Sequence, residues 1–187
     1  MSNLIPQILL VVIFLTVVFL HMSRKNIAAA AIYGVQSLAI SILMVVFSLN
    51  HGTWSLVLIA FMTLIVKVII APQFFIKLVK KHELKFSAST YLNTPLTLII
   101  VTALTIFAHT EKLSPLWGLV PANEKFLSLS LSIILISFFL IINRKGALSQ
   151  IVGILSLENG IVAFALFAGL EQSIGLQMGK QLKAFRE

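Results

Sequence analysis

The sequence predicts an all-α membrane protein with about six transmembrane helices. Of its 187 residues, 59% are hydrophobic, and the mean hydropathy is +1.05, whereas ordinary globular chains are roughly 45–50% apolar. The apolar residues gather in long stretches, and a helix needs about 20 of them to cross a bilayer. Six stretches fit, at residues 4–22, 27–49, 54–79, 92–109, 126–142 and 147–170, of which the fifth is the shortest. They form one predicted helix bundle, residues 1–170, followed by a short basic tail, residues 171–187.

Basic residues beside these stretches predict the orientation of the chain. No basic residue precedes the first stretch, and Arg24 and Lys25 follow it, which predicts a span with its N-terminus outside and not a signal peptide. The second and fourth loops hold only Lys112 and Lys125. Eight basic residues lie in the first, third and fifth loops, at positions 24, 25, 77, 80, 81, 85, 144 and 145. Placement beside the bilayer therefore explains the net charge of +8 better than nucleic-acid binding does.

The second span contains residues that favour close contact between helices. Ala30 and Gly34 are small and four positions apart, and Ser156 and Gly160 have the same spacing in the sixth span. This spacing lets two helices approach closely. Gln36 is polar within the second span, and we expect it to form a hydrogen bond to another helix.

The third span carries a lysine at mid-depth. Lys67 lies about 15 Å from the basic edge at Lys77, at a rise of 1.5 Å per residue, so its amine cannot reach the interface. Pro72 lacks the N–H that would bond the carbonyl of Val68, which predicts a kink and a free acceptor near the amine. The third span therefore has a predicted polar spot at its centre.

The start of the fourth span has a helix-capping pattern. Thr94 followed by Pro95 predicts an N-cap with proline at the first helical position. Trp54 and Trp117 lie at predicted outer boundaries, where aromatic residues gather in membrane proteins.

Glu158 lies near the centre of the sixth span, and a buried charge there is costly enough to suggest a function. We expect it to pair with Lys67 at similar depth, directly or through water. Such a pair has two interpretations. It pins helices together while its charges neutralise each other, or it exchanges protons with a water chain. Gln150 and Asn159 could support Glu158 by hydrogen bonding, although Asn159 is turned about 100° away and favours a neighbouring helix.

Most catalytic and metal sites are excluded by composition. The sequence has no Cys and no Asp, so disulfides, iron–sulfur clusters and Ser-His-Asp sites cannot form. It also has no glycine-rich phosphate loop. The four histidines fall at helix ends or in loops, where we expect solvation at the interface and not haem ligation. We therefore expect no catalytic site, no metal and no cofactor. These histidines are His21, His51, His82 and His109.

Three segments together resemble component E of hydrogenase-4, a membrane subunit of formate-hydrogenlyase and energy-converting hydrogenase complexes. They are residues 33–38 around Gln36, residues 64–72 with Lys67 and Pro72, and residues 150–160 with Glu158 and Asn159. Their order and their placement on spans two, three and six carry the likeness, which covers about residues 33–169.

The resemblance implies a non-catalytic subunit in the membrane arm of a redox complex related to respiratory complex I. In such complexes a peripheral hydrogenase-type arm drives proton or sodium translocation through antiporter-like membrane subunits. The sixth span is also similar to the glutamate-bearing helix of subunit K of NADH–quinone oxidoreductase. By that likeness Glu158 carries protons laterally between neighbouring subunits, with Lys67 as its charge partner. The implied location is the bacterial inner membrane or the archaeal plasma membrane.

The chain departs from the family at its C-terminal end. Family members look as if they continue into a seventh span with acidic residues, whereas residues 171–175 resemble only the approach to it. Residues 179–187 cannot cross a bilayer, and they fit either a basic helix along the interface or a truncated or frame-shifted gene product. Two other functions remain open. One is a purely structural scaffold that docks antiporter-like subunits. The other is a stand-alone small ion transporter, although spans three and six show no matching repeat.

Overall fold

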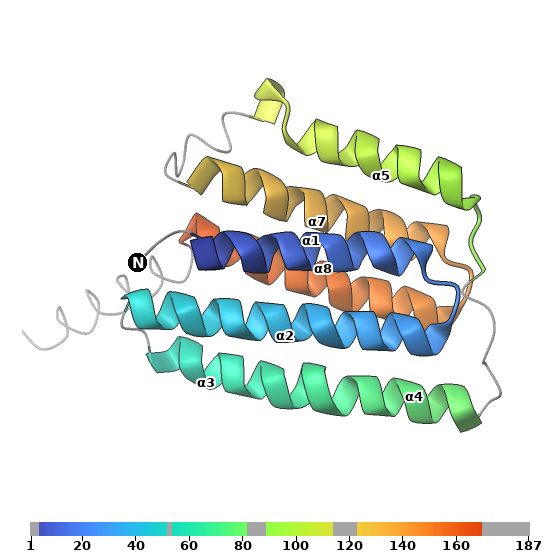
Figure 1. Ribbon diagram of the computed structural model, residues 1–187, viewed down its shortest axis with the longest axis horizontal. Coiled ribbons are helices and arrows are strands. Elements are labelled where there is room, and N and C mark those ends of the chain that lie inside the picture. Colours follow the sequence, from blue (N-terminus) through green and yellow to red (C-terminus); the bar gives the residue numbers. More distant parts are fainter. Residues whose placement is uncertain (1–3, 52–53, 82–88, 114–122, 170–187) are drawn as a thin grey trace, which may run out of the picture.

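The computed structural model describes residues 4–51, 54–81, 89–113 and 123–169. Nearly all of these residues are helical, and the helices lie side by side in alternating directions (Figure 1). The predicted all-α, membrane-type bundle is confirmed. The helices are α1 (Leu4–Met22), α2 (Asn26–His51), α3 (Trp54–Thr63), the π-helix η1 (Leu64–Ile70), α4 (Ala71–Lys81), α5 (Thr94–Ala108), the 3-10 helix η2 (Glu111–Leu113), α7 (Glu124–Asn143) and α8 (Ala147–Ala168).

The lengths of these helices match a bilayer, with one difference from the prediction. The third span consists of α3, η1 and α4, which follow one another without a break (Figure 1). Among the described counterparts of the six predicted spans, the shortest is α5, with 15 residues, whereas the prediction made the fifth span the shortest. That fifth span, α7, has 20 residues because its polar ends, Glu124 and Asn143, are also helical. In the described residues five segments are long and apolar enough to cross a membrane: Leu4–Met22, Asn26–Asn50, Leu56–Val79, Glu124–Asn143 and Ala147–Ala168.

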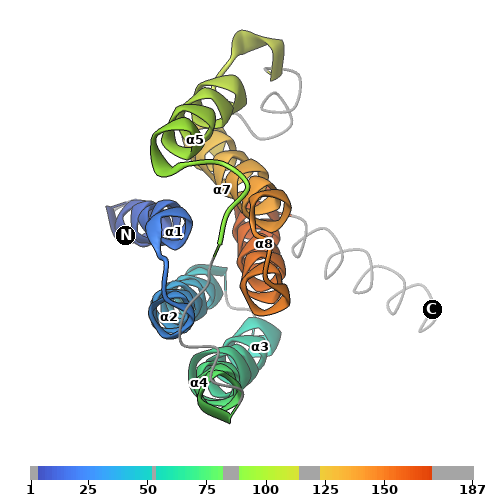
Figure 2. The same cartoon turned by 90° about the vertical axis from the view of Figure 1, so that its right-hand side faces the viewer.

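The bundle is organised around α2, α7 and α8. The helix α8 packs between α2 and α7, while α1 covers α2 and α7 from one side. The third span, α3 with η1 and α4, packs against α2, and α5 packs mainly against α7. The end-on view shows these outer helices at opposite ends of the bundle (Figure 2). The central helices therefore hold the best protected positions for polar side chains.

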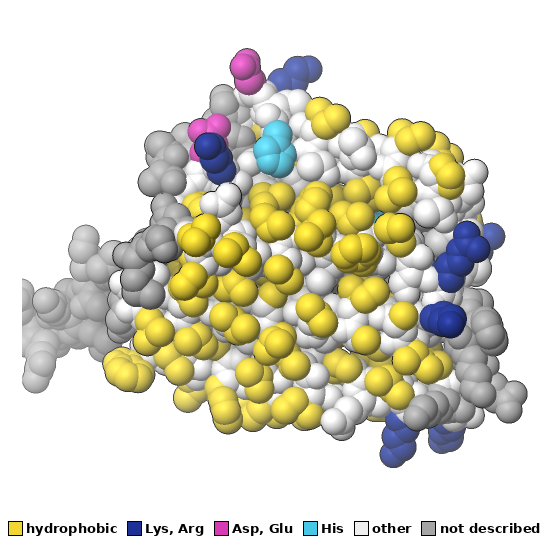
Figure 3. Space-filling model, viewed as in Figure 1, with side chains coloured by type: hydrophobic (Ala, Val, Ile, Leu, Met, Phe, Trp, Pro, Cys, Tyr) yellow, Lys and Arg dark blue, Asp and Glu magenta, His cyan; other side chains and the backbone are white. Residues whose placement is uncertain are grey.

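Large apolar side chains cover the outside of the bundle. Phe19 on α1, Trp54 on α3 and Ile99 on α5 are all more than half exposed. Figure 3 shows that such side chains spread across the middle of the molecule. A surface of this kind is unusual for a protein in water, since large exposed apolar patches mark contact with a membrane or a partner. The surface thus supports a multi-pass membrane protein.

Charged side chains lie at the two ends of the bundle. The ends of α1, α4 and α7 and the starts of α2, α5 and α8 all lie at one end of the bundle (Figure 1), and lysines and arginines gather there (Figure 3). The basic residues of this end include Arg24, Lys25, Lys77, Lys81, Arg144 and Lys145. The opposite end carries Glu111 with Lys112 and Glu124 with Lys125. The basic end is thus the one that the charge pattern predicts, while the orientation in the membrane stays a prediction.

Glycines bring the central helices close together. A Cβ at Gly160 would lie 2.9 Å from Cγ2 of Ile133, and one at Gly153 would lie 2.8 Å from Cγ1 of Ile141. Both contacts join α8 to α7. A Cβ at Gly34 on α2 would lie 3.4 Å from Cγ of Pro72 on α4, which is an ordinary contact. The packing role predicted for Gly34 and Gly160 is therefore confirmed, and it is most demanding between α7 and α8.

The cap of α5 differs from the prediction by one residue. Asn93, and not Thr94, is the N-cap: its backbone is extended, and its side-chain Oδ1 accepts a hydrogen bond from the N–H of Leu96 at 3.1 Å. Thr94 is already helical, so Pro95 falls in the first turn one position later than predicted. Asn caps a helix more favourably than Thr does, which explains the shift.

Several predictions concern residues outside the described part of the chain. They are the basic tail at residues 171–187, Lys85 and His82 in the third loop, and Trp117 in the fourth.

Candidate functional site: a polar cluster inside the bundle

Lys67 lies in a π-helical segment. The seven residues of η1, Leu64–Ile70, connect α3 to α4, and the N–H of Ala71 bonds the carbonyl of Val66, five residues earlier. Pro72 follows directly and has no N–H to offer an α-helical bond. The sequence predicted a kink at this proline, and the structure instead widens the preceding turns. Short π-helical segments occur frequently at functional sites.

Lys67 forms an ion pair with Glu158. The distance from Nζ of Lys67 to Oε1 of Glu158 is 2.8 Å, and it joins the third span to α8. Both residues lie about halfway along their helices, so the predicted contact at similar depth is present. The two side chains differ in exposure: 14% for Lys67 and 52% for Glu158. The lysine is therefore enclosed by the bundle, whereas the carboxylate reaches the outer surface.

Asn159 connects this ion pair to α2. Its Oδ1 accepts a hydrogen bond from Nζ of Lys67 at 3.2 Å. Its Nδ2 donates to Oε1 of Gln36 at 3.3 Å and to Oγ of Ser37 at 3.2 Å. Asn159 and Gln36 are completely buried. Asn159 thus bonds neighbouring helices, as predicted, and gives the amine of Lys67 a second partner beside Glu158.

The polar cluster continues from Gln36 toward α7. Nε2 of Gln36 donates to Oγ of Ser156 at 3.0 Å, which confirms the predicted hydrogen bond between helices. Oγ of Ser156 also lies 3.0 Å from Oγ of Ser137 on α7. All three side chains are fully buried. Hydrogen-bonded contacts therefore run from the half-exposed Glu158 to the interior of the bundle.

Tyr33 adds a hydroxyl near this cluster. It lies one turn before Ser37 on α2 and is completely buried. Its hydroxyl forms no hydrogen bond of normal geometry with the described residues. A buried polar group without a partner is costly, so such a group commonly marks a water or a functional role.

Gln150 does not belong to the cluster. The sequence suggested that it supports Glu158, but its Nε2 donates to the carbonyl of Arg144 at 2.9 Å. It lies in the first turn of α8, two turns away from Glu158, and closes the junction between α7 and α8. The role predicted for Gln150 in the site is therefore wrong, because the nearby backbone carbonyl offers a closer acceptor.

With this geometry established, the chain can be compared with known proteins. No family model, curated protein or solved structure matches it. Function must therefore be inferred from the residues themselves. The described residues contain no group of three or more His, Cys, Asp or Glu side chains that could hold a metal ion. A carboxylate paired with an amine can bind and release protons or hold a small cation, and it can also hold helices together.

Serines are the main part of the cluster that the sequence did not point to. The sequence assigns Ser156 only a packing role, Ser37 enters it only as part of the segment 33–38, and no pattern marks Ser137. Serine is frequent in membrane helices as a small residue, so its presence alone does not indicate a hydrogen bond between helices. The spacing from Ser156 to Asn159 places both on one face of α8, and this was the available signal.

The ion pair can be tested through stability. We expect Lys67→Met to lower the free energy of unfolding by about 2 kcal/mol, because it leaves the Glu158 charge without its partner; the exposure of Glu158 keeps the loss below that of a fully buried pair. The double variant Lys67→Met with Glu158→Met should regain most of the loss. Denaturant titration in detergent micelles measures both. Lys112→Met, at an exposed lysine, is the control, and simple additivity of the two changes would rule out the coupling.

Proposed function

We propose that this chain is a non-catalytic subunit that moves protons, or sodium ions, in the membrane arm of a hydrogenase-type redox complex related to complex I. It contributes no redox centre of its own. Its partners are antiporter-like membrane subunits and a peripheral hydrogenase-type arm. The proposed location is the bacterial inner membrane or the archaeal plasma membrane, with the N-terminus outside.

The exposure of Glu158 is the observation that carries this proposal. A carboxylate halfway along a membrane helix is costly if it faces lipid. Glu158 is nevertheless 52% exposed, although Lys67 already pairs with it from the inside. We therefore infer that a neighbouring protein covers the exposed part of this side chain. A chain that works inside a larger complex explains this arrangement, whereas a chain alone in lipid does not.

The cluster offers a physical way for Glu158 to accept and release a proton. When a proton binds the carboxylate, the ion pair with Lys67 loses its attraction. Asn159 still accepts a hydrogen bond from the lysine at 3.2 Å, so the amine keeps a partner inside the bundle. Loss of the proton restores the pair. When Glu158 is protonated, Lys67 can thus leave the ion pair and still keep its hydrogen bond to Asn159.

The resemblance to hydrogenase-4 component E agrees with this arrangement. Its three segments lie on α2, on η1 with α4, and on α8, and each contributes to the same cluster. Gln36 comes from the first, Lys67 from the second, and Glu158 with Asn159 from the third. Segments far apart in the sequence therefore meet where the resemblance implies a shared function. This convergence supports the proposal.

The structure also gives support to a purely structural role. Gln36, Ser156, Ser137 and Asn159 bond one another across three helices, and such a network can fix the packing of a bundle. In that case the chain is a scaffold that docks antiporter-like subunits. Substitution of Glu158 or Lys67 would then prevent assembly of the complex, whereas a role in proton movement predicts an assembled complex that no longer moves protons.

Purification in a mild detergent tests the proposal directly. We expect the chain to copurify with antiporter-like subunits and the large subunit of a nickel-iron hydrogenase, identified by mass. A matched preparation from cells that lack the chain should lose the membrane partners. A chain that migrates alone after gentle extraction would contradict both the proposed function and the scaffold, and would favour a stand-alone ion transporter.

A further inference from the structure

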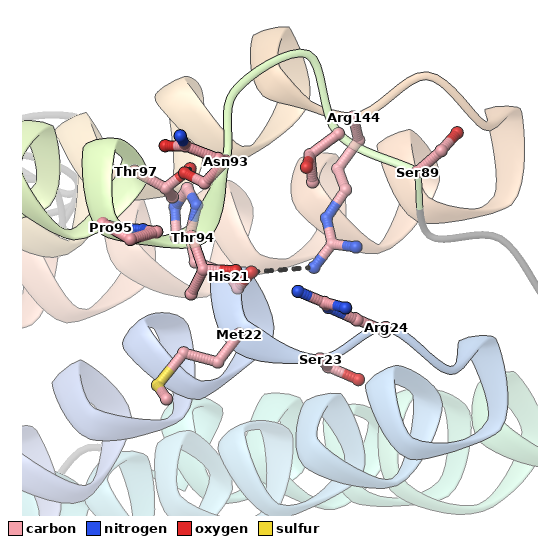
Figure 4. A pocket seen from close by; sticks show the side chains of 11 residues that line it. His21, Met22, Ser23, Arg24, Ser89, Asn93, Thr94, Pro95, Thr97 and Arg144 are labelled. Atoms are coloured by element: carbon pink, nitrogen blue, oxygen red, sulfur yellow. Dashed lines mark hydrogen bonds between the residues drawn. The ribbon is translucent and has the colours of Figure 1, made fainter.

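A second polar site lies at the basic end of the bundle, away from the ion pair. It is a cavity of about 530 Å³ between the end of α1, the start of α5 and the junction of α7 with α8. Figure 4 shows its lining side chains. Arg24, Arg144 and His21 supply its charged and titratable groups, and Ser89, Thr90 and Thr94 add hydroxyls. The predicted site did not include any of these residues.

The cavity is positively charged and preorganised. Arg144 is 2% exposed, and its guanidinium donates hydrogen bonds to the carbonyls of Leu20 and His21 at the end of α1. These bonds fix the guanidinium against the wall. Arg24 is exposed and lies at the rim. Among the described residues no carboxylate lines the cavity. An arginine held in place in this way is suited to binding a phosphate group.

His21 adds a buried acceptor. It is only 5% exposed, and its Nε2 lies 3.0 Å from the carbonyl of Ile136. Because a carbonyl can only accept, Nε2 carries the hydrogen, and the neutral ring leaves Nδ1 as an acceptor. Nδ1 is buried and has no partner among the described residues. In Figure 4 the ring points toward Thr94 and Thr97 on α5. The cavity therefore combines positive charge with an unsatisfied acceptor for a hydroxyl group.

The position of the cavity indicates the source of such a ligand. It lies where α1 ends and α5 begins, at the end of the bundle where the basic residues gather. Because α1 is long and apolar enough to cross a bilayer, we expect this end to lie at the level of the lipid headgroups. Met22 and Pro95 give its lining an apolar part, and the exposed Leu96 continues this surface along α5. The start of α5 also directs the positive end of its helix dipole toward the cavity. A phospholipid whose phosphate is held here could place its acyl chains beside the apolar face of α5.

We propose that this cavity binds the headgroup of an anionic phospholipid, with its phosphate between Arg24 and Arg144 and a headgroup hydroxyl on His21. Phosphatidylglycerol has this combination of a phosphodiester and free hydroxyls. Bound lipid would add a bridge between the ends of α1 and α5, beside the hydrogen bonds that already tie Arg144 to the carbonyls of Leu20 and His21.

Lipid titration of the purified full-length chain tests the proposal. Native mass spectrometry in a neutral detergent should show phosphatidylglycerol binding more tightly than phosphatidylcholine, which is zwitterionic. The variant Arg24→Gln should weaken phosphatidylglycerol binding about fivefold, as expected for the loss of one basic side chain at a lipid headgroup. Lys25→Gln is the matched control, because it removes an equal charge from the neighbouring exposed position, which does not line the cavity.

Three results would overturn the proposal. Equal binding of the two lipids would exclude recognition of a negative headgroup. Equal losses in Arg24→Gln and Lys25→Gln would show general attraction to the basic end and no specific site. Displacement of bound phosphatidylglycerol by millimolar inorganic phosphate would assign the cavity to a soluble phosphate compound. Retained binding in the control, with loss in Arg24→Gln alone, would support the lipid site.

Discussion

In the proposed redox complex, Glu158→Gln is expected to leave assembly intact and to lower the proton movement coupled to the redox reaction by about tenfold or more. Glutamine keeps the size of the side chain and can still accept a hydrogen bond from Lys67. It cannot bind and release a proton, and a positioned acid–base group commonly contributes a hundredfold or more to the rate of a proton transfer. Proton uptake per donor oxidised, measured in sealed membrane vesicles, gives the coupling. A native gel of the same membranes gives the assembly.

The exposed Glu124 provides the control for this experiment. It lies at the start of α7, on the end of the bundle opposite to the basic residues, and Glu124→Gln changes the same chemical group outside the cluster. We expect it to leave both assembly and coupling unchanged. Full coupling in assembled Glu158→Gln complexes would refute the proton role, and loss of the complex itself would favour the scaffold.

Gly160→Leu is expected to have the largest effect on stability, a loss of about 3 kcal/mol or failure to fold. A Cβ at this position would lie 2.9 Å from Cγ2 of Ile133 and 3.3 Å from the backbone nitrogen of Ile134. The isoleucine side chain can turn aside for a methyl group. The backbone of α7 cannot move away without separating from α8, since the two helices pack along much of their length. Thermal unfolding in detergent micelles measures the loss.

Gly34→Ala is the matched control for this prediction. A Cβ at Gly34 would lie 3.4 Å from Cγ of Pro72, so a methyl group fits with little movement. We expect the unfolding temperature to stay near that of the original protein or to rise, because alanine favours a helix more than glycine does. An unfolding temperature for Gly160→Leu equal to that of Gly34→Ala would show that the close contact between α7 and α8 contributes nothing.

The positions of the helices could be predicted because a membrane helix is a long, continuous stretch of apolar residues, which the sequence shows directly. The first span, Leu4–Met22, has the predicted bounds, and the sixth differs by two residues at its end. The contact between Lys67 and Glu158 also followed from depth alone, since two opposite charges at mid-bilayer are costly apart. Charge and hydropathy are properties of single residues, and the sequence displays them directly.

The features that the sequence could not predict depend on which side chains and backbone groups come into contact in the folded bundle. The kink expected at Pro72 became a π-helical segment, because the missing N–H can be accommodated by a change in register as well as by a bend. Gln150 donates a hydrogen bond to the backbone carbonyl of Arg144, a contact that no sequence pattern indicates. His21 was expected to be solvated, yet it is buried and its ring stacks on Phe139 with ring centroids 5.2 Å apart. Such choices are decided by packing, which a single sequence does not show.

The same limit applies to the direction that Glu158 faces. Its neighbour Asn159 is completely buried, while Glu158 is half exposed. The sequence placed both near the centre of a span, but a helix whose faces are all apolar gives little indication of which face is inside. The hydrogen bonds of the cluster determine which face of α8 is inside, because Ser156 and Asn159 both bond Gln36 from the buried face.

The π-helix makes the number of residues before Lys67 as important as their identity. Each residue turns an α-helix by about 100°, and a π-helix closes its bonds over one residue more. Deletion of a single residue from the start of Leu64–Ile70 would allow ordinary α-helical bonds, but it would rotate α3 by about 100° relative to Lys67. Exchanges among leucine, isoleucine and valine there preserve the turn. The apolar positions of the segment should therefore tolerate such exchanges, whereas a change in its length should not be tolerated.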